Sequence, residues 1–284
     1  MTEISDIDFD YLNKWVGKTE TATDIVTSGL IERFHATFGG WLYKDGERVP
    51  LGLHWCLSPL VAPLTELGPD GHPARGGFLP PVPLENRMWA GGRVSFYASL
   101  EVDKVVARTS RIASLTPKIG RSGPLIFVSV DHDYRIDDRL IIEERQDIVY
   151  RTPQPQPTKI AAVQSAAKPG DFVGDPVTLF RYSALTFNSH RIHFDHPYVT
   201  EKEGYAGLVV HGPLQATLLM NAAAVETGTS QISFDYRGLS PLIAGQAVSL
   251  RKSHDKIWLE KASGDATFEG RFSTSEPESP TAHD

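Results

Sequence analysis

The residues best suited to chemistry lie in one short polar stretch, Phe187–Asp195 (FNSHRIHFD). It holds two histidines, His190 and His193, together with Asn188 and an aspartate. An imidazole changes its protonation near neutral pH, so it can take a proton from a reacting group and return it. This combination of residue types predicts a site of general acid–base chemistry.

A second candidate feature is Gly207–Leu214 (GLVVHGPL), which ends at the start of an expected helix. Pro213 suits a first helical turn, because its missing N–H would have no partner there. The backbone N–H groups of a first turn are unpaired and carry a partial positive charge, which makes the Gly212 N–H a candidate oxyanion-binding group. An imidazole beside such a helix start predicts chemistry alpha and beta to a thioester carbonyl.

Less reactive interpretations apply to the neighbouring residues. A single histidine in a loop is more often solvated or hydrogen-bonded than catalytic, and His211 is expected to support its loop rather than to react. Arg191 and Asp195 can pair with each other or cap a turn. Zinc binding is an alternative for His190 and His193, but no set of carboxylates or cysteines accompanies that pair, so we expect no metal.

The elements that must position these residues follow the same order in both halves of the chain. The segment after His211 is apolar nearly all round, with Leu214 and Leu218 on one stripe and Met220 outside it, as in a helix buried inside a curved sheet. Runs rich in β-branched and aromatic residues predict strands near 93–102, 103–115, 124–135, 139–151, 230–237, 246–254, 256–262 and 265–273. A helical segment followed by antiparallel strands, twice, predicts an α+β fold of two helix-in-sheet units.

A weak internal repeat supports two units. Arg93–Phe96 (RVSF) matches Gln231–Phe234 (QISF), and Leu53–His54 aligns with Val210–His211. We expect a first unit over 1–151, a proline-containing connector over 152–176, a second unit over 177–274 and a frayed tail over 275–284. The Gly/Pro-dense stretch 68–92 is expected to pack on the surface or over a site.

Composition narrows the class of protein. The chain has 284 residues and a formal net charge of −7, which disfavours a nucleic-acid binder. Cys56 is the single cysteine, so an internal disulfide is excluded and a reducing compartment, the cytoplasm, is expected. The sequence has no apolar stretch long enough to span a membrane, and its start resembles neither a secretory signal nor a transit peptide.

At these residues the sequence resembles the double-hotdog, MaoC-like (R)-specific enoyl-thioester hydratases and dehydratases. The subgroup it is most similar to includes mesaconyl-C4-CoA hydratase, itaconyl-CoA hydratase and 3-hydroxyacyl-thioester dehydratase type 2. The stretches that carry the resemblance are Phe180–Asp195, Tyr205–Leu214, Leu79–Gly92 and Gln146–Arg151. They span both halves of the chain.

The resemblance implies a double hotdog fold and a site in the second half. His193 falls on the position of the family's catalytic histidine, and the Gly212 N–H on its oxyanion contact. The family's aspartate position holds Asn188, which cannot accept a proton. Either His193 acts alone as the base while the Asn188 amide holds the water, which we favour, or His190 or Asp195 supplies the missing acid–base partner.

The resemblance also implies a substrate. We expect reversible addition of water to a 2-enoyl-CoA, most of all a short C5 dicarboxylyl-CoA, with Arg181 and Arg191 as partners of the second carboxylate and with His190 and His211 in the binding site. Alternatives are a fatty-acid-type 3-hydroxyacyl-thioester dehydratase, a hotdog thioesterase and a non-catalytic acyl-CoA-binding module. No cofactor is expected, since CoA belongs to the substrate. We further expect a homodimer or higher homo-oligomer, and a first half that walls the acyl pocket without chemistry of its own.

Overall fold

The computed structural model describes residues 4–44, 49–120, 123–152 and 167–275. Most of the expected connector, 153–166, and nearly all of the expected tail, 276–284, lie outside these ranges. No helix within them combines the length and the apolar character that crossing a membrane requires.

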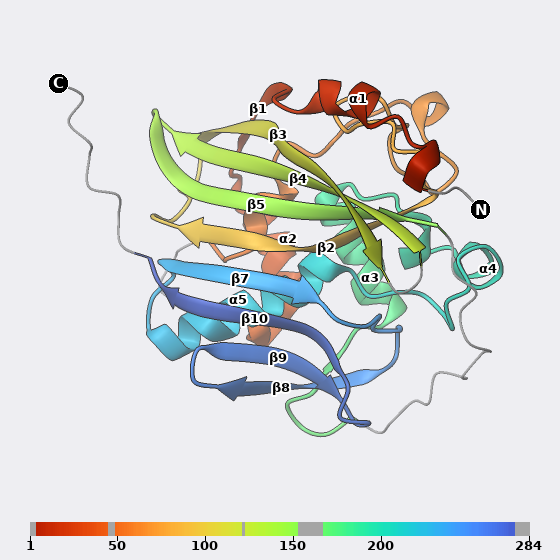
Figure 1. The fold of residues 1–284 in the computed structure, drawn as a ribbon. Helices are drawn as coiled ribbons and strands as arrows, with labels where there is room; N and C mark the ends of the chain where they lie inside the picture. Colours follow the sequence, from red (N-terminus) through yellow and green to blue (C-terminus); the bar gives the residue numbers. More distant parts are fainter. Residues whose placement is uncertain (1–3, 45–48, 121–122, 153–166, 276–284) are drawn as a thin grey trace.

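One antiparallel sheet of ten strands organises the molecule (Figure 1). Its order is β1-β3-β4-β5-β2-β7-β10-β9-β8-β6, so the first half of the chain supplies one side and the second half the other. The strands of the first half are β1 (Thr19–Ile25), β2 (Asn86–Phe96), β3 (Val105–Gly120), β4 (Gly123–Ile136) and β5 (Arg139–Arg151). Those of the second half are β6 (Phe172–Val173), β7 (Ile232–Gly238), β8 (Ala247–Ser253), β9 (Lys256–Lys261) and β10 (Ala266–Thr274).

The two halves meet at the β2–β7 pair, where the sequence repeat becomes visible in space. Ser95 lies directly opposite Ser233, and their hydroxyl oxygens are 2.8 Å apart. These two serines are equivalent positions in the RVSF and QISF segments. The junction is therefore a pseudo-two-fold axis, as expected for two copies of one unit joined edge to edge.

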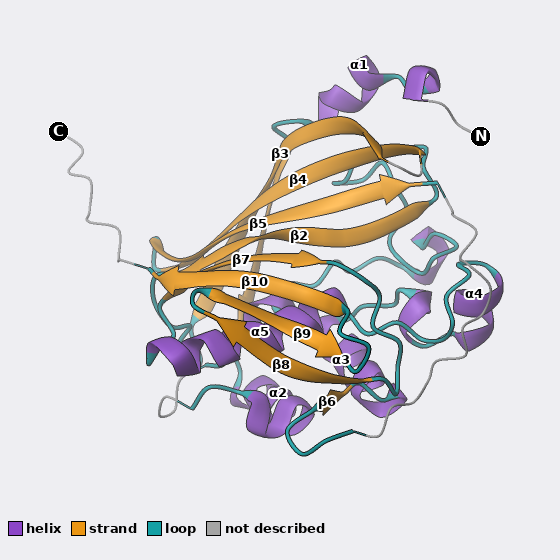
Figure 2. Ribbon diagram, turned by 60° about the horizontal axis from the view of Figure 1, so that its bottom comes forward, coloured by secondary structure: helices purple, strands orange, loops and turns teal. Residues whose placement is uncertain are grey.

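The helices lie on one face of this sheet (Figure 2). They are α2 (Ser28–Phe38), α3 (Pro176–Thr186) and α5 (Gly212–Thr227), with the short α1 (Phe9–Leu12) and α4 (His196–Glu201) nearer the periphery. Leu214, Leu218, Leu219 and Met220 of α5 are 0% exposed. This confirms the expected buried helix inside a curved sheet.

The eight predicted strands are all present, and two further strands were missed. β1 (TETATDI) alternates only between exposed and half-buried positions, so its sequence shows no apolar face. β6 has only two residues and lies inside the range expected to be connector. β2 begins at Asn86 rather than near 93, so the end of the 68–92 stretch is part of the sheet.

The first half differs from the second where its own buried helix would begin. The segment that aligns with the start of α5 forms only a single 3-10 turn, Leu53–Cys56. Asn221 of α5 reaches across and donates a hydrogen bond to the Leu51 carbonyl at 3.0 Å. The two units therefore differ in detail: within the described residues, the long apolar helix is α5 of the second half, and the first half has a 3-10 turn at the aligned position.

This packing predicts a stability difference within one helix. Leu218→Ala should lower the free energy of unfolding by about 2–5 kcal/mol, because the side chain is fully buried and its removal leaves a cavity. Val225→Ala is the matched control on the same helix, since Val225 is 61% exposed and should change stability by no more than about 0.5 kcal/mol. Urea unfolding of both variants measures this, and equal losses would contradict the packing described.

Candidate functional site

Four histidine rings from the two halves of the chain lie side by side. His211 stacks on His193 with ring centroids 3.5 Å apart, His193 lies 5.4 Å from His190, and His190 lies 4.2 Å from His72. We call these four residues the histidine row. Three of them belong to the motifs singled out in the sequence, and the fourth comes from the 68–92 stretch.

His193 is held in one orientation by the backbone. It ends a 3-10 turn, Arg191–His193, and its Nδ1 lies 2.6 Å from the Val209 carbonyl oxygen. A carbonyl can only accept a hydrogen bond, so Nδ1 carries the proton and Nε2 keeps a lone pair. Burial lowers the pKa of His193 to about 4, which keeps the ring neutral and able to act as a base at pH 7.

His211 stacks against the ring of His193. It is fully buried, and its Nε2 lies 2.9 Å from the Ser183 hydroxyl of α3. Burial lowers its pKa well below the ordinary value, so both stacked imidazoles are neutral. The stack ties the catalytic candidate His193 to the residue that directly precedes α5.

Gly212 opens α5, and no side chain caps this helix start. A Cβ on Gly212 would lie 2.8 Å from Cε3 of Trp89, so only glycine lets the β2 tryptophan pack there. Uncapped amides at the N-terminus of a buried 16-residue helix favour negative charge on a ligand. The predicted oxyanion group and His193 are therefore close, because they are linked through His211.

Asn188 and His190 shape the loop between α3 and His193. α3 ends at Thr186, and the residue after it, Phe187, has a left-handed conformation with φ of 50°. The Asn188 side-chain oxygen then accepts a hydrogen bond from the backbone N–H of His190 at 2.9 Å. Asn188 thus places His190, whose ring is buried within the row and whose pKa burial lowers well below its usual value.

Three other residues predicted for the site are engaged elsewhere. Arg191 pairs with Asp195 through two of its nitrogens, at 2.9 and 2.7 Å, and Asp195 also caps α4 by accepting from the Tyr198 N–H. Arg181 is exposed and donates to the Ala36 carbonyl of α2 at 3.0 Å. Asp195 is therefore occupied as a structural group, and a substrate-binding role for either arginine stays a prediction.

Three residues of the site were not predicted from the sequence: His72, which belongs to the row, and Asp70 and Arg87, which adjoin it. The 68–92 stretch places Asp70 and His72 against the motif loop, with His72 Nδ1 3.1 Å from Asp70 Oδ2 and Arg87 Nη2 3.7 Å from that same oxygen. Gly71 has φ of +87°, and a Cβ there would lie 2.0 Å from the Ser189 carbonyl oxygen. The signal available in the sequence was an aspartate and a histidine two residues apart in a Gly/Pro-dense stretch.

One cluster in the described part of the chain has a spacing that could suit a metal ion. One ligand atom from each of Asp70, His72 and His190 lies within 4.8 Å of the other two. The Arg87 guanidinium lies 3.7 Å from the Asp70 carboxylate, so a cation bound there would face a fixed positive charge. This arrangement suits a neutral ligand better than a metal.

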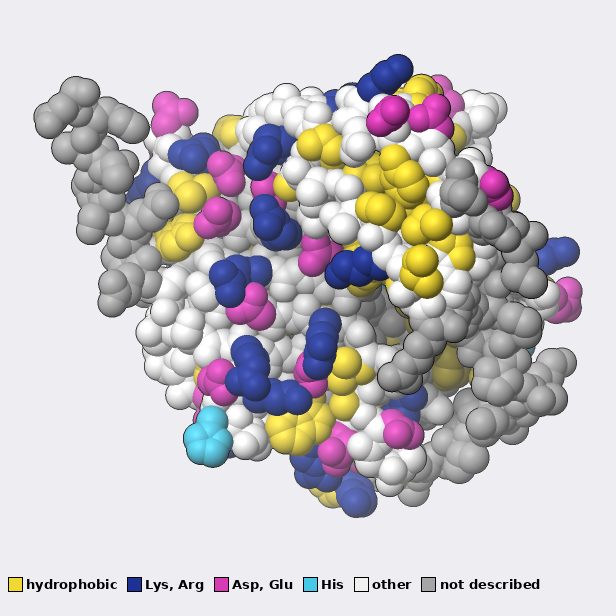
Figure 3. Space-filling model, viewed as in Figure 1, with side chains coloured by type: hydrophobic (Ala, Val, Ile, Leu, Met, Phe, Trp, Pro, Cys, Tyr) yellow, Lys and Arg dark blue, Asp and Glu magenta, His cyan; other side chains and the backbone are white. Residues whose placement is uncertain are grey.

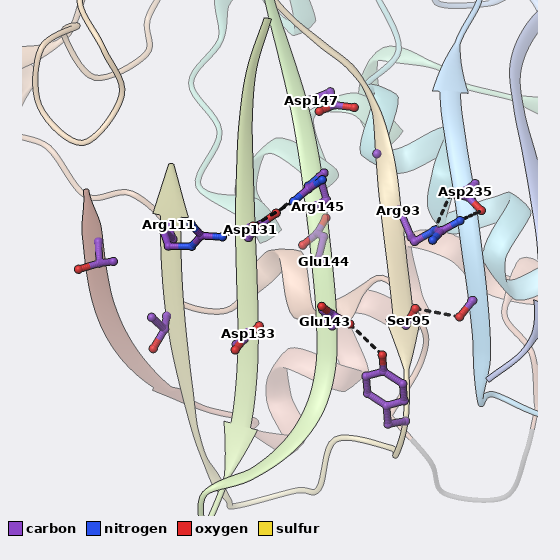
Figure 4. A pocket seen from close by; sticks show the side chains of 15 residues that line it. Arg93, Ser95, Arg111, Asp131, Asp133, Glu143, Glu144, Arg145, Asp147 and Asp235 are labelled. Carbon is purple, nitrogen blue, oxygen red and sulfur yellow. Dashed lines mark hydrogen bonds and ion pairs between the residues drawn. The ribbon is translucent and has the colours of Figure 1, made fainter. Parts of the chain in front are cut away.

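Two cavities lie in different places relative to the row. A cavity of about 880 Å³ adjoins it, and its lining includes Asp70, Arg87 and Arg191. A groove of about 930 Å³ lies on the strand face seen in Figure 1, where Lys, Arg, Asp and Glu side chains intermingle (Figure 3). Its arginines already bind carboxylates across neighbouring strands, as in Arg93–Asp235 and Arg145–Asp131 (Figure 4). No histidine of the row lines either cavity.

Comparison with known proteins identifies the family of the chain. The family model for hydroxyacyl-thioester dehydratase type 2 matches residues 52–244, which include the whole histidine row. The chain is 42% identical over 256 residues to mesaconyl-C(4)-CoA hydratase of Chloroflexus aurantiacus, covering 87% of this chain and 91% of that protein.

Solved structures support the fold. HtdX of Mycobacterium tuberculosis superimposes with a TM-score of 0.65 at 15% identity, covering 91% of this chain and all of that one. A second Mycobacterium tuberculosis protein, described as having a double hotdog fold, gives a TM-score of 0.52 at 15% identity and covers 91% of this chain and 96% of that one. With the sequence match and the sheet of two joined halves, the chain belongs to the hydroxyacyl-thioester dehydratase type 2 family, the MaoC-like hydro-lyases of hotdog fold.

Proposed function

We propose that this protein adds water reversibly to the double bond of a short C5 dicarboxylyl-CoA, such as mesaconyl-C4-CoA or itaconyl-CoA. The observation that carries the proposal is the stack of His193 on His211, because it places a neutral base next to the N-terminus of α5. The 42% identity to mesaconyl-C(4)-CoA hydratase over most of both chains supports the substrate class.

Gly212 acts on the thioester carbonyl in this mechanism. Its N–H, with the α5 dipole behind it, polarises the carbonyl and stabilises the enolate that forms when water adds. Trp89 covers this helix start and limits the access of bulk water. The helix terminus is preorganised, so little reorganisation opposes the reaction.

His193 moves the proton. Its Nε2 takes a proton from water as the oxygen bonds to the β carbon, and the proton is then returned to the α carbon. Val209 keeps the ring in the tautomer that this step needs. Asn188 holds the loop that carries His190, and its side-chain amide remains our proposal for orienting the water.

The proposed setting follows from the same chemistry. CoA thioesters are small soluble substrates, and the free thiol of Cys56 fits the cytoplasm. Burial raises the pKa of that thiol to about 12, so it takes no part in catalysis. We propose a homodimer or higher homo-oligomer as the working assembly.

His193→Ala should lower turnover by at least ~100-fold, because a single general base typically contributes 10²–10⁴-fold. The loss of enoyl absorbance measures hydration, and a thiol dye run in parallel detects any release of free CoA. His196→Ala is the control, since His196 is exposed and lies outside the row. Near-full activity of His193→Ala, or thiol release by the unmodified protein, would refute the proposed function.

The protonation state of His193 can be tested separately. At pH 5.5 its imidazole should remain neutral, because burial holds its pKa near 4 and an ordinary histidine is mostly protonated at that pH. Nitrogen-15 NMR of the histidine rings measures this, with the His193 signal identified by its absence in His193→Gln. A His193 ring that titrates near 6.5 would contradict the buried neutral base.

A substrate panel tests the second carboxylate. Mesaconyl-C4-CoA or itaconyl-CoA should be hydrated with a kcat/KM at least ~10-fold above that of crotonyl-CoA, equivalent to ~1.4 kcal/mol of transition-state binding. Arg181→Gln should reduce that preference and leave crotonyl-CoA unaffected if Arg181 binds the carboxylate. A preference for crotonyl-CoA would favour the fatty-acid-type dehydratase instead.

A further inference from the structure

On the motif loop, Asn188–Asp195, no carboxylate is free to support an imidazole that takes up a proton, and the His190 ring is buried and neutral. The proposed mechanism needs a water that is both held and deprotonated, and a neutral amide at position 188 can hold but not deprotonate. The Asn188 oxygen is already used on the His190 N–H, and Asp195 is used on Arg191 and on the start of α4. A partner for His193 must therefore come from another segment.

The first half of the chain brings such a group to the loop. The backbone N–H of Arg191 donates to the Asp70 carbonyl at 2.9 Å, and Ser189 donates through its hydroxyl to the Gly71 carbonyl. These bonds fix His72 with its ring centroid 4.2 Å from that of His190. His72 thus lies in the row because two segments more than a hundred residues apart are tied together at two successive positions, Asp70 and Gly71.

The protonation states of Asp70 and His72 suit a base. Burial disfavours ionisation of Asp70, but hydrogen bonds from His72 and the charge of Arg87 outweigh it and hold the pKa of Asp70 below its ordinary value. A carboxylate only accepts, so His72 Nδ1 carries the proton and Nε2 keeps a lone pair. This is the same tautomer as His193, but with a carboxylate behind the ring, which stabilises an imidazolium better than a carbonyl does.

The convergence of three polar atoms defines where a water would sit. Atoms of Asp70, His72 and His190 lie within 4.8 Å of one another, a span that one water bridges with ordinary hydrogen bonds. A buried water needs two to four polar partners, and this point offers three. The nearby Arg87 guanidinium disfavours a cation at the same place.

We propose that Asp70 and His72 form a second acid–base unit that divides the proton transfer with His193. In this scheme His72, in place of His193, holds and deprotonates the attacking water, and Asp70 stabilises the charge that His72 acquires. His193 keeps the second step and delivers the proton to the α carbon. This inference rests on the proposed hydratase function. The row begins at His211, beside the oxyanion amide of Gly212, so His193 lies nearer the α carbon of a bound thioester. His72, two rings further along, lies nearer the β carbon.

The proton balance is as follows. The water O–H bond breaks and its proton goes to His72 Nε2, while the oxygen–β-carbon bond forms and the π electron pair moves into the enolate held by Gly212. The proton then passes by way of His190 and His193 to the α carbon, so the enolate is quenched and every imidazole ends neutral. Dehydration runs the same steps in reverse, with His72 protonating the departing hydroxide.

Groups from both halves face His72 and set its basicity. Burial lowers the pKa of His72, the hydrogen bond and charge of Asp70 raise it, and the positive charges of Arg87 and Arg75 lower it further. His190 faces it from the motif loop and is itself neutral. Asp70 is thus the one group among these that favours the imidazolium.

The test uses the full chain with His72→Ala, Asp70→Asn and the double variant. His72→Ala should lower kcat by ~10²–10⁴-fold with a smaller change in KM, and Asp70→Asn should lower it by at least ~10-fold. Because the two residues act as one unit, the double variant should fall no further than His72→Ala alone. Imidazoles added to His72→Ala should restore turnover, and the restored rate should rise with the basicity of the imidazole used.

Controls separate this inference from the proposed function and from a structural role. His196→Ala removes an exposed imidazole outside the row and should retain activity, and melting temperatures of all variants report folding. If the unmodified protein hydrates no enoyl-CoA, the proposed function itself fails. If it is active and His193→Ala is inactive, but His72→Ala retains kcat within ~3-fold, only the Asp70–His72 unit is refuted. A restored rate that does not depend on the basicity of the imidazole would indicate that the Asp70–His72 pair is only a structural support. Additive losses in the double variant would indicate the same, and either result would refute the proposed acid–base unit.

Discussion

The contact on which the rest of the site depends is the stack of His193 on His211. One ring belongs to the proposed base, and the other to the residue directly before α5, the longest helix in the described part of the chain. The Val209 carbonyl fixes the first ring and the Ser183 hydroxyl the second. The proposed base and the proposed oxyanion donor are therefore held near each other by α3, α5 and the turn between them.

The two halves of the chain share one architecture but contribute different elements to the candidate site. The second half keeps α5 and the motif loop. The first half has a 3-10 turn where its own helix would begin, and contributes instead Trp89 over the helix start and the 68–92 stretch over the loop. Because β2 pairs with β7, the two halves form one sheet, and segments of the first half can pack against the helix and loop of the second. The proposed site draws on residues of both halves, which the joined sheet holds together.

The sequence predicts most of the strands, the buried helix and several candidate site residues. The elements and residues that it does not predict have physical reasons. Eight strands and α5 were predicted because their apolar patterns are strong. His193, His190 and Gly212 were chosen as candidates because polar residues cluster there beside an apolar helix. β1 was missed since it buries no side chain fully. His72 and Asp70 were missed because their partners are about 120 residues away and local composition says nothing of such contacts. For Arg191 the sequence allowed two interpretations, binding of the substrate carboxylate and pairing with Asp195 four residues later. The structure contains the ion pair.

The most direct test of the account is a crystal structure of the protein with a saturated acyl-CoA, which has no double bond to hydrate and so stays unreacted. The account predicts the thioester oxygen within about 3 Å of the Gly212 nitrogen, with the α carbon facing His193 and the β carbon facing the space between His190 and His72. A thioester bound in the charged groove over β2–β5, or one whose β carbon contacts none of the row, would contradict it.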